Sequence, residues 1–316
     1  MDLIIVGGGV SGLTTAHTLL ARGHRVRVIA AEWHPDIVSS VAAAVWYPYK
    51  VDHPQVSAWG QTSFERFRAL AAAGHTGVKM VQGIEYRFDA ATEVPAWAGA
   101  VEAFESVDEV DVPAPFRSAL RFRVPIIETP RYLAWLRAEV ATRATLSTRR
   151  VETLHDLAGQ ADAIINCAGL AARELVGDEL IYPIRGQIVK LPPGGMEEFV
   201  LVQETDDHPE PSYIIPRADG IVCGGTAQPY QWDTTPDAAT TKAILRRVAT
   251  LRPDLAARPP LETRVGLRPA RPTIRLEAEH RGGMLVIHNY GHGGAGFTLS
   301  WGCAAAVANL LDQTTP

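Results

Sequence analysis

The segment GGGVSG at residues 7–12 fits the pattern GxGxxG and is the first feature of the chain that could do chemistry. Gly7 would permit a tight turn, Gly9 would let backbone N–H groups approach a pyrophosphate, and Gly12 would let a helix pack closely on a strand. The start of that helix would also favour negative charge. The segment predicts a dinucleotide-binding turn. The alternative is a glycine turn that only connects a strand to a helix.

A carboxylate lies at the spacing that such a turn requires. Glu32 follows Gly12 by twenty residues and comes just after a second apolar run at residues 25–30. At the end of a strand in this position, a carboxylate can accept hydrogen bonds from both hydroxyls of a ribose. This pairing favours a bound dinucleotide, and both FAD and NAD fit it.

A second glycine cluster, HNYGHGGAGF, occupies residues 288–297 between a predicted strand and a predicted helix. Several unhindered backbone amides would meet the start of the helix dipole there, which makes a second anion-binding site. Two such sites in one chain favour a long cofactor such as FAD, with its pyrophosphate at the first and its isoalloxazine at the second. The alternative is a flexible glycine loop. We expect His292 to be a structural hydrogen-bond donor to backbone rather than a base.

Arg268 ends a predicted strand at residues 261–268, where alternation places it on the same face as Gly266. We expect Gly266 to leave space beside Arg268. A planar guanidinium beside bare backbone could clamp a substrate carboxylate with two parallel hydrogen bonds. The alternative is a solvated face that Arg268 shares with other arginines of this segment.

The elements that must position these groups alternate along the chain. We expect strands at residues 3–6, 25–30, 78–88, 146–151, 163–167, 184–191, 212–216, 220–223, 261–268 and 284–288. We expect helices at residues 10–20, 55–73, 129–143, 235–251 and 296–311, with Thr129-Pro130 and Thr235-Pro236 as capped starts. The first three elements form a βαβ opening. A change of composition from Tyr47 onward indicates a second domain inserted into the first, with its own sheet.

Composition limits the classes of function. The 316 residues are 47% hydrophobic and 21% charged, which fits a globular protein of about two domains. A net charge of −5 without any run of five like charges gives no reason to expect nucleic-acid binding. No signal segment and no apolar span of 18 residues occurs, so we expect a cytoplasmic protein without a membrane anchor. The three cysteines, Cys167, Cys223 and Cys303, lack metal-like spacing and are expected in the core, and no metal site is predicted.

Five segments resemble the D-amino-acid oxidase and D-aspartate oxidase family, in the family's order and across nearly the whole chain. They are AAAVWYPY at residues 42–49, NCAG at 166–169, RGQI at 185–188, VGLRPARP at 265–272 and HNYGHGG at 288–294. The resemblance implies an α/β fold, α+β overall, in which a Rossmann-like FAD-binding domain is interleaved with a substrate domain built on a mixed sheet. We place the FAD-binding domain at residues 1–45, 129–182 and 269–316, and the substrate domain at 46–128 and 183–268.

The resemblance also implies a reaction. Neutral D-amino acids would lose a hydride from the α-carbon to flavin N5, giving an imino acid that water hydrolyses to a 2-oxo acid and ammonia. Oxygen would then take the electrons and become hydrogen peroxide. Arg268 and Tyr213 would hold the substrate carboxylate, and the Gly294 carbonyl would receive the amine. No side chain needs to act as a base, because the lone pair of a neutral amine drives hydride departure once the substrate is positioned and desolvated. Relatives are often dimers, so a homodimer is expected.

The resemblance assigns further residues. Near FAD it places Gly7, Gly8, Gly9, Val10, Ser11, Gly12, Glu32, Ser39, Ser40, Ala43, Ala44, Val151, Ala168, Gly293, Gly294, Gly296, Phe297 and Thr298. The side-chain pocket is expected to consist of Val45, Tyr47, Leu201, Val202 and Ile215. None of these is cationic, so acidic substrates are disfavoured, because an unpaired buried charge is costly. Pro209 lies in a shortened segment where mammalian members place a second tyrosine over the site.

Rival functions remain at this point. A D-aspartate oxidase, a glycine or sarcosine oxidase, or a quinone-linked dehydrogenase would share much of the same sequence pattern. A non-catalytic dinucleotide-binding module would keep the first glycine turn. It would have no reason to keep Arg268, Tyr213 and the glycines at 293–294 together.

Overall fold

The computed structural model describes residues 1–49, 51–90, 94–108 and 112–314. Its helices are α1 (Val10–Ala21), α2 (Val38–Val41), α3 (Val56–Ala73), α4 (Thr129–Ala141), α5 (Ala172–Val176), α6 (Ala238–Leu251) and α7 (Gly296–Thr314). Its strands are β1 (Asp2–Val6), β2 (Arg25–Ala30), β3 (Val78–Arg87), β4 (Glu102–Val107), β5 (Ser118–Ile127), β6 (Thr145–Thr148), β7 (Ala163–Asn166), β8 (Tyr182–Leu191), β9 (Phe199–Val202), β10 (Ser212–Arg217), β11 (Gly220–Gly224), β12 (Gln228–Pro229), β13 (Glu262–Arg281) and β14 (Met284–His292).

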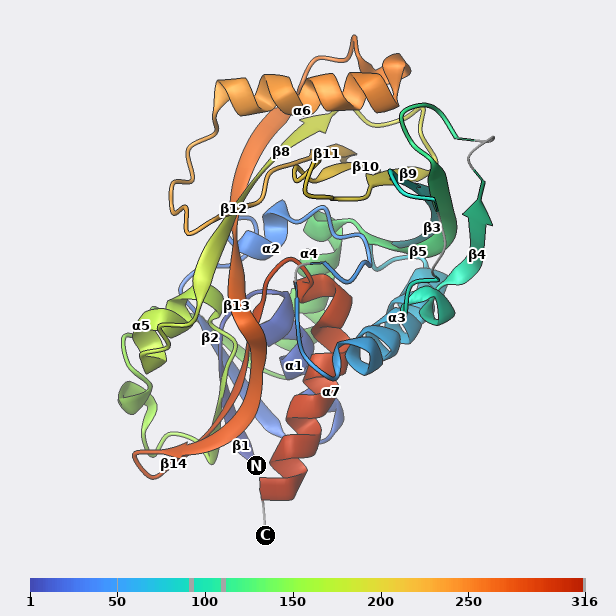
Figure 1. The fold of residues 1–316 in the computed structure, drawn as a ribbon. Helices are drawn as coiled ribbons and strands as arrows, with labels where there is room; N and C mark the ends of the chain where they lie inside the picture. The colour runs from blue at the N-terminus through green and yellow to red at the C-terminus, as the bar shows by residue number, and fades with distance from the viewer. Residues whose placement is uncertain (50, 91–93, 109–111, 315–316) are drawn as a thin grey trace.

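The strands form one mixed sheet whose two halves differ in direction (Figure 1). In one half, β14, β7, β1, β2 and β6 are paired in parallel, as in a Rossmann-like domain. In the other half, the pairs from β4 to β13 are antiparallel except for β3 with β9. The mixed α/β architecture expected from the sequence is confirmed.

Strand β13 joins the two halves. Its first part pairs with β8 from Glu262 to Ala270, and its second part pairs with β14 from Arg275 to Arg281. The sequence predicted a strand that ends at Arg268 and a separate inserted sheet, and both predictions were wrong. The strand continues past Pro269 and Pro272 for 20 residues in all, because a shift of register between Ala270 and Arg275 accommodates the prolines.

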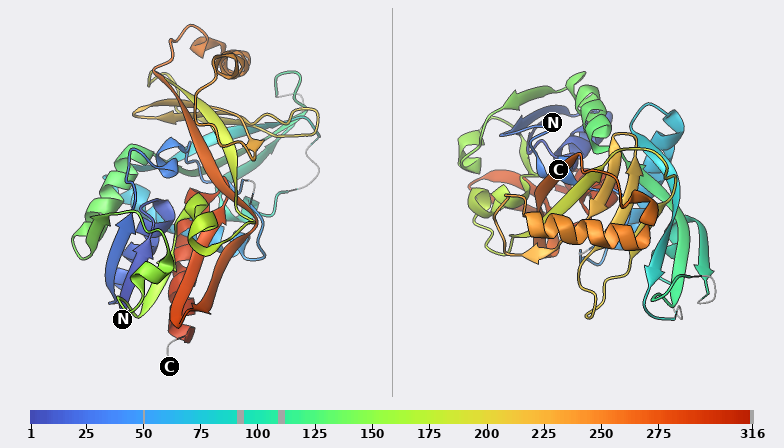
Figure 2. Two further views of the ribbon diagram at one scale, coloured as in Figure 1. Left: turned by 90° about the vertical axis from the view of Figure 1, so that its left-hand side faces the viewer. Right: turned by 90° about the horizontal axis from the view of Figure 1, so that it is seen from above.

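Helices cover both halves of the sheet. Helix α1 packs against α4 and α7, and α7 also packs against α3, so these four helices bury one side of the molecule (Figure 1). Helix α6 lies across β8, β10 and β11 at the opposite end, as the view from above in Figure 2 shows. The core beneath α1 and α4 contains fully buried residues such as Leu19, Leu133 and Leu136. Helix α6 covers the face of the sheet that carries Val200 and Ile214, so the opposite face, which carries Leu201 and Tyr213, is left to form the site.

Local sequence sets most helix ends. Helix α4 starts at Thr129-Pro130 as predicted, because proline fits the first turn, where its missing N–H costs nothing. The predicted start of α6 at Thr235-Pro236 was too early. Asp237 is the actual cap, and its Oδ1 accepts the backbone N–H of Thr240 at 2.7 Å.

Several elements escaped the sequence analysis or differ from it. Strands β4, β5 and β9 were not predicted, and β6 ends at Thr148 rather than continuing to Val151. The three cysteines are buried and unpaired, as expected for core residues. Among the described residues, none of the helices has the length and apolar character that a membrane span requires.

Candidate active site

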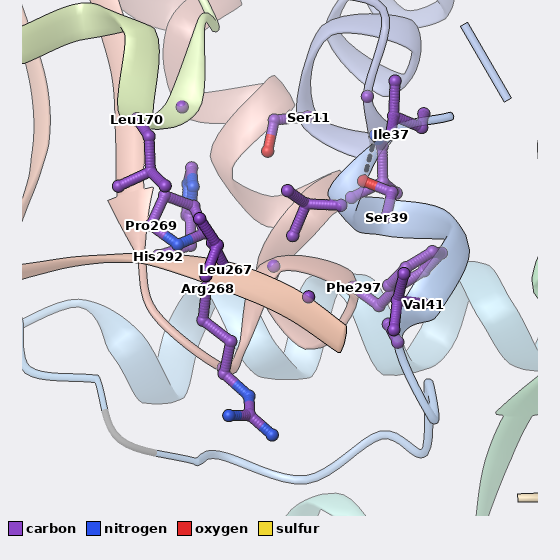
Figure 3. Close-up of a pocket in the computed structure, with 18 of the residues that line it drawn as sticks. Ser11, Ile37, Ser39, Val41, Leu170, Leu267, Arg268, Pro269, His292 and Phe297 are labelled. Carbon is purple, nitrogen blue, oxygen red and sulfur yellow. Dashed lines mark hydrogen bonds between the residues drawn. The ribbon is translucent and has the colours of Figure 1, made fainter. Parts of the chain in front are cut away.

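One cavity of about 790 Å³ runs from the glycine turn after β1 to Arg268 on β13 (Figure 3). The parallel half contributes the nucleotide end, which includes residues 7–11, Glu32 and Val151. The other half contributes the part that we call the substrate end. The substrate end is lined by Val45, Tyr47, Tyr49, Glu85, residues 201–204, residues 211–213 and Arg268. The cavity therefore joins the two glycine clusters and the arginine that the sequence singled out.

The glycine turn is too tightly packed for side chains at Gly7, Gly8 and Gly12. A Cβ at Gly12 would lie 2.0 Å from the carbonyl oxygen of Gly7, and Gly7 itself has a φ of +125°. Gly9 differs, because the nearest atom to a Cβ there is Ser39 Oγ at 3.2 Å. Ser39 Oγ also accepts the backbone N–H of Val10 at 3.1 Å, as the dashed line in Figure 3 marks. Gly12 thus permits packing, while Gly9 keeps the backbone open toward the cavity.

Sixteen of the predicted cofactor residues line the cavity: Gly7, Gly8, Gly9, Val10, Ser11, Glu32, Ser39, Ala43, Ala44, Val151, Ala168, Gly293, Gly294, Gly296, Phe297 and Thr298. Two do not. Gly12 lies beneath the turn, and Ser40 is buried with its Oγ 2.8 Å from Nδ1 of His34. Ser40 follows Ser39 in a short helix, so the two side chains point in different directions.

The second glycine cluster lies at the junction of the two ends of the cavity. Gly293 has a φ of +53°, and a Cβ at Gly294 would lie 2.3 Å from Cδ1 of Tyr49, so both positions require glycine. Helix α7 begins at Gly296, directly after this turn. This cavity fits FAD. The open glycine backbone at the nucleotide end suits the pyrophosphate, and the helix start at the middle of the cavity suits the isoalloxazine.

His292 is a buried structural residue. Its Nε2 lies 3.0 Å from Oδ1 of Asn289, so it contacts a side chain rather than the backbone group that we expected. The Nδ2 of Asn289 in turn donates to Oγ1 of Thr15 in α1 at 3.1 Å. Burial lowers the pKa of His292 to about 4, so the ring is neutral and holds the turn in place.

Arg268 extends across the neighbouring strand into the substrate end. A Cβ at Gly186 of β8 would lie 2.3 Å from its Nη1 and 2.6 Å from its Nη2. Nη1 also donates to the carbonyl oxygen of Thr226 at 3.0 Å. The expectation that Gly266 makes this space was wrong. A Cβ at Gly266 would instead face Val41 at 3.2 Å, because the long arginine side chain leans over β8 and away from its own strand.

Tyr213 of β10 lies beside Arg268, and its ring packs on a glycine of the neighbouring strand β11. A Cβ at Gly224 of β11 would lie 1.9 Å from Cζ of the tyrosine ring, so this close approach also requires glycine. Burial raises the pKa of Tyr213, and the nearby Arg268 charge acts in the opposite direction. The phenol therefore keeps its proton and can donate a hydrogen bond to an anion held by Arg268.

Four of the five residues predicted for the side-chain pocket lie along the cavity. Val45, Tyr47, Leu201 and Val202 line the cavity. Ile215 does not, because it is fully buried in the core farther along β10 than the cavity extends. Pro209 does not line the cavity either, although Pro211 does.

Tyr49 was missed, although it lies in the segment AAAVWYPY. Its ring lies 6.0 Å from the Arg268 guanidinium, measured from Cζ to the ring centroid. Burial raises its pKa, and Glu204 is among its hydrogen-bond partners. The Tyr49 ring therefore lies next to both the Arg268 guanidinium and the turn at Gly294. The signal for it was an aromatic residue two positions after Tyr47.

Glu85 was also missed, and nothing in its local sequence marked it. Tyr47 Oη donates to its Oε1 at 2.9 Å, while its Oε2 has no hydrogen-bond partner among the described residues. Only 6% of Glu85 is exposed. Burial raises the pKa of this carboxyl group, and the Tyr47 hydrogen bond opposes that effect. The substrate end therefore contains a desolvated acid that the sequence analysis had not included.

Comparisons with known proteins agree with this arrangement. Residues 2–310 match the family model described as DAO, FAD dependent oxidoreductase. The chain is 45% identical to a D-amino-acid oxidase of Rubrobacter xylanophilus, over 97% of this chain and 94% of the relative. It is 39% identical to a D-amino-acid oxidase of Streptomyces coelicolor, over 98% and 97%. The crystal structure of glycine oxidase from Geobacillus kaustophilus has the same fold, with a TM-score of 0.81 at 22% identity over 100% of this chain and 95% of that one.

Proposed function

The chain belongs to the DAO family of FAD dependent oxidoreductases, and from this premise we propose that it oxidises D-amino acids to 2-oxo acids, with release of ammonia and hydrogen peroxide. Two relatives named D-amino-acid oxidase, similar over nearly their whole length, support the substrate class. The observation that carries the proposal is the placement of Arg268 and Tyr213 together in the same cavity as the two glycine clusters.

The chain's own residues bind and orient the substrate. Arg268 forms a two-pronged ion pair with the α-carboxylate, and the protonated Tyr213 donates a further hydrogen bond to it. The Gly294 carbonyl accepts a hydrogen from the α-amine, which fixes the remaining direction of the α-C–H bond. FAD bound along the cavity would be held by residues 7–11, 293–294 and 296–298, and it would supply the acceptor for the hydride and the route of the electrons to oxygen.

No side chain of the substrate end is placed to act as a general base in this proposal. Burial keeps the phenols of Tyr47, Tyr49 and Tyr213 protonated, and Glu85 is held by Tyr47. The substrate amine must therefore enter in its neutral form. The apolar side chains of Val45 and Leu201 exclude water, so positioning and desolvation supply the rate enhancement.

Acidic substrates are disfavoured by the charges that line the substrate end. Among its described residues, Arg268 is the cation, and the α-carboxylate already uses it. Glu85 and Glu204 are the other charged groups there, and both would repel a second carboxylate. A D-aspartate oxidase activity is therefore the weaker alternative. The likeness to glycine oxidase at 22% identity extends to the fold and does not favour glycine as substrate.

Further parts of the proposal concern organisation. We assign residues 1–45, 129–182 and 269–316 to an FAD-binding domain and residues 46–128 and 183–268 to a substrate domain. We also expect a homodimer, which light scattering of the purified protein would test. A cytoplasmic location is supported by three buried, unpaired cysteines, because disulfides are rare in reducing compartments.

An absorption spectrum under nitrogen tests the proposed function. The purified protein should be yellow, lose its flavin absorbance on addition of D-alanine and keep it with L-alanine. In air, D-alanine should yield peroxide, while glycine and sarcosine should yield far less. A protein that stays colourless with added FAD, or whose colour persists with every D-amino acid tried, would refute the proposal.

A further inference from the structure

Glu85 lies in one row with Leu201 and Tyr213 across three neighbouring strands. Tyr213 of β10 pairs with Leu201 of β9, and Leu201 pairs with Glu85 of β3. Residues paired in this way point to the same face of a sheet, and all three line the cavity. Neighbouring strands are about 4.8 Å apart, so the α-carbons of Tyr213 and Glu85 are separated by roughly 10 Å. One end of this row binds the α-carboxylate, and the other end is an acid.

The surface between the two ends is apolar. Leu201 lies at the centre of the row, and Val45 and Val202 line the same part of the cavity. A side chain that lies along this surface would bury its methylene groups on the way to Glu85. Lysine and arginine have this character, with an apolar stem and a charged head.

The charge balance of the substrate end also favours a cation. Arg268 is offset by the substrate's own α-carboxylate. Glu85 then remains as a buried acidic group, and Glu204 is a second, half-exposed acidic group that lines the same cavity. A positive side-chain charge would offset part of this excess, whereas a neutral side chain would leave Glu85 paired only with the Tyr47 hydroxyl.

Glu85 also separates the cavity from a second, outer hollow of about 550 Å³. Tyr47 and Glu85 line both, so they form the wall between them. Arg87 lies on the outer side, where its Nε forms an ion pair with Oδ1 of Asp89 at 3.0 Å. The charge of Arg87 also acts on Glu85, where it opposes the rise in the pKa of that carboxyl group, but Oε2 of Glu85 has no hydrogen-bond partner among the described residues.

We propose that Glu85 is a specificity-determining residue that selects D-amino acids with a positively charged side chain, such as D-lysine and D-arginine. This inference rests on the proposed function and goes beyond the neutral substrates expected from the sequence. The substrate ammonium or guanidinium donates to the Glu85 carboxylate while Tyr47 holds its other oxygen. The terminal torsion of a glutamate has a broad energy minimum, so the carboxylate can turn toward the cavity at little cost.

The dimensions agree with this assignment. The lysine ammonium lies five bonds from the α-carbon, which is roughly 6 Å in an extended chain. That reach spans most of the row from the carboxylate site to Glu85. A methyl side chain ends near the start of the row and gains nothing from the acid.

A pair of ligands that cannot be oxidised tests the inference directly. Lysine without its α-amine is 6-aminohexanoate, and hexanoate is the same molecule without the ammonium. Calorimetric titration of the FAD-loaded protein should show 6-aminohexanoate binding about tenfold or more tighter than hexanoate, because a buried hydrogen bond between charged groups contributes that much. Equal binding, tighter binding of hexanoate, or no binding of 6-aminohexanoate would overturn the inference.

Variants of Glu85 assign the effect to this residue. Glu85→Gln should reduce the preference for 6-aminohexanoate over hexanoate to about threefold or less. Glu85→Asp should retain part of this preference because the charge remains. Glu105→Gln is the matched control, since it makes the same chemical change on β4 at an exposed side chain. An unchanged preference in Glu85→Gln would overturn the assignment. If Glu85→Gln does not bind FAD, the comparison of 6-aminohexanoate with hexanoate on the unmodified protein still tests the inference.

Steady-state kinetics separates this inference from the proposed function. The ratio of kcat/KM for D-lysine to that for D-norleucine should exceed about ten and should fall toward one in Glu85→Gln. If D-norleucine and D-alanine are oxidised but D-lysine has no advantage, the inference fails and the proposed function stands. If no D-amino acid is oxidised, the proposed function fails, and the calorimetric preference still reports on Glu85.

Discussion

The two ends of the cavity are built in different ways. The nucleotide end depends on backbone, with glycines at residues 7–12 whose spacing is visible in six consecutive letters. The substrate end depends on side chains from separate segments, with Arg268 on β13, Tyr213 on β10 and Glu85 on β3. A backbone site is thus encoded locally, whereas a side-chain site is created by strand pairing.

The largest expected effect concerns packing at the nucleotide end. Gly12→Ala should prevent stable folding, because the new Cβ would lie 2.0 Å from the Gly7 carbonyl oxygen and backbone would have to move. We expect a loss of about 4 kcal/mol or more in the free energy of unfolding, measured by urea denaturation or as a loss of soluble yield. Gly99→Ala is the control, since nothing lies within 4 Å of a Cβ there.

Gly9→Val should separate folding from cofactor binding at the same turn. A Cβ at Gly9 meets only Ser39 Oγ, at 3.2 Å, so the chain should fold, but the side chain would occupy space that the pyrophosphate needs. The purified variant should show a normal circular dichroism spectrum and no flavin absorbance. A yellow, FAD-loaded Gly9→Val protein would contradict the assignment of this glycine.

Arg268→Ala should damage the substrate end and leave the nucleotide end intact. Removing one partner of a buried charged pair typically costs several kcal/mol, so KM for D-alanine should rise by about two orders of magnitude or more. The variant should remain yellow. Arg268→Lys should recover only part of the loss, because an ammonium cannot form the two parallel hydrogen bonds. Unchanged kinetics in Arg268→Ala would remove this residue from the site.

Gly186→Ala should reproduce a milder form of that defect from a neighbouring strand. The new Cβ would lie 2.3 Å from Nη1 of Arg268, and the end of a flexible side chain can move aside. We therefore expect KM to rise by about tenfold with little change in Tm. Gly266→Ala is the informative comparison, because its Cβ would face Val41. A larger effect on KM in Gly266→Ala would favour the expectation from sequence over the structure.

The last prediction concerns stability at the junction of the two ends. His292 has a pKa lowered to about 4 in the folded protein, below the ordinary value of 6.5, so the unfolded chain binds more protons between these values. Stability should therefore fall as the pH decreases from about 6.5 toward 4. At about pH 4.5 this residue should account for roughly 2 kcal/mol of lost stability.

The measurement for His292 compares two proteins rather than two pH values alone. Many groups titrate in this window, so the drop in unfolding free energy between about pH 7 and about pH 4.5 should be smaller in His292→Gln than in the unmodified protein. His75→Gln is a suitable control at an exposed position. Parallel pH profiles for the unmodified protein and His292→Gln would contradict the assigned burial effect.

Most residues that the sequence assigned to the cofactor line the cavity, because a turn and its helix depend on neighbouring residues. It also located Arg268 and Tyr213, since an arginine in VGLRPARP and a strand tyrosine matched a known family pattern. The sequence could not assign Gly186 or Glu85. Their roles follow from which strands pair and in what register, and that information lies in no local segment.

The expectation about Gly266 failed for the same reason. Alternation along one strand correctly placed Gly266 and Arg268 on one face, but the arginine side chain crosses to the next strand. The predicted separation into two sheets failed because β13 continues through a change of register and pairs with strands of both halves. In both cases a contact between neighbouring strands, which the sequence of a single segment does not reveal, determined the structure.

The length of β13 has a consequence for how the protein loses its structure. Because this strand is hydrogen-bonded to β8 over one part and to β14 over the other, melting either half would free one part of the same strand. The two halves should therefore open together as one cooperative unit, and slowly exchanging amides should be found both in the part of β13 that pairs with β8 and in the part that pairs with β14. An enzyme built in this way would lose cofactor and substrate sites in a single transition on heating.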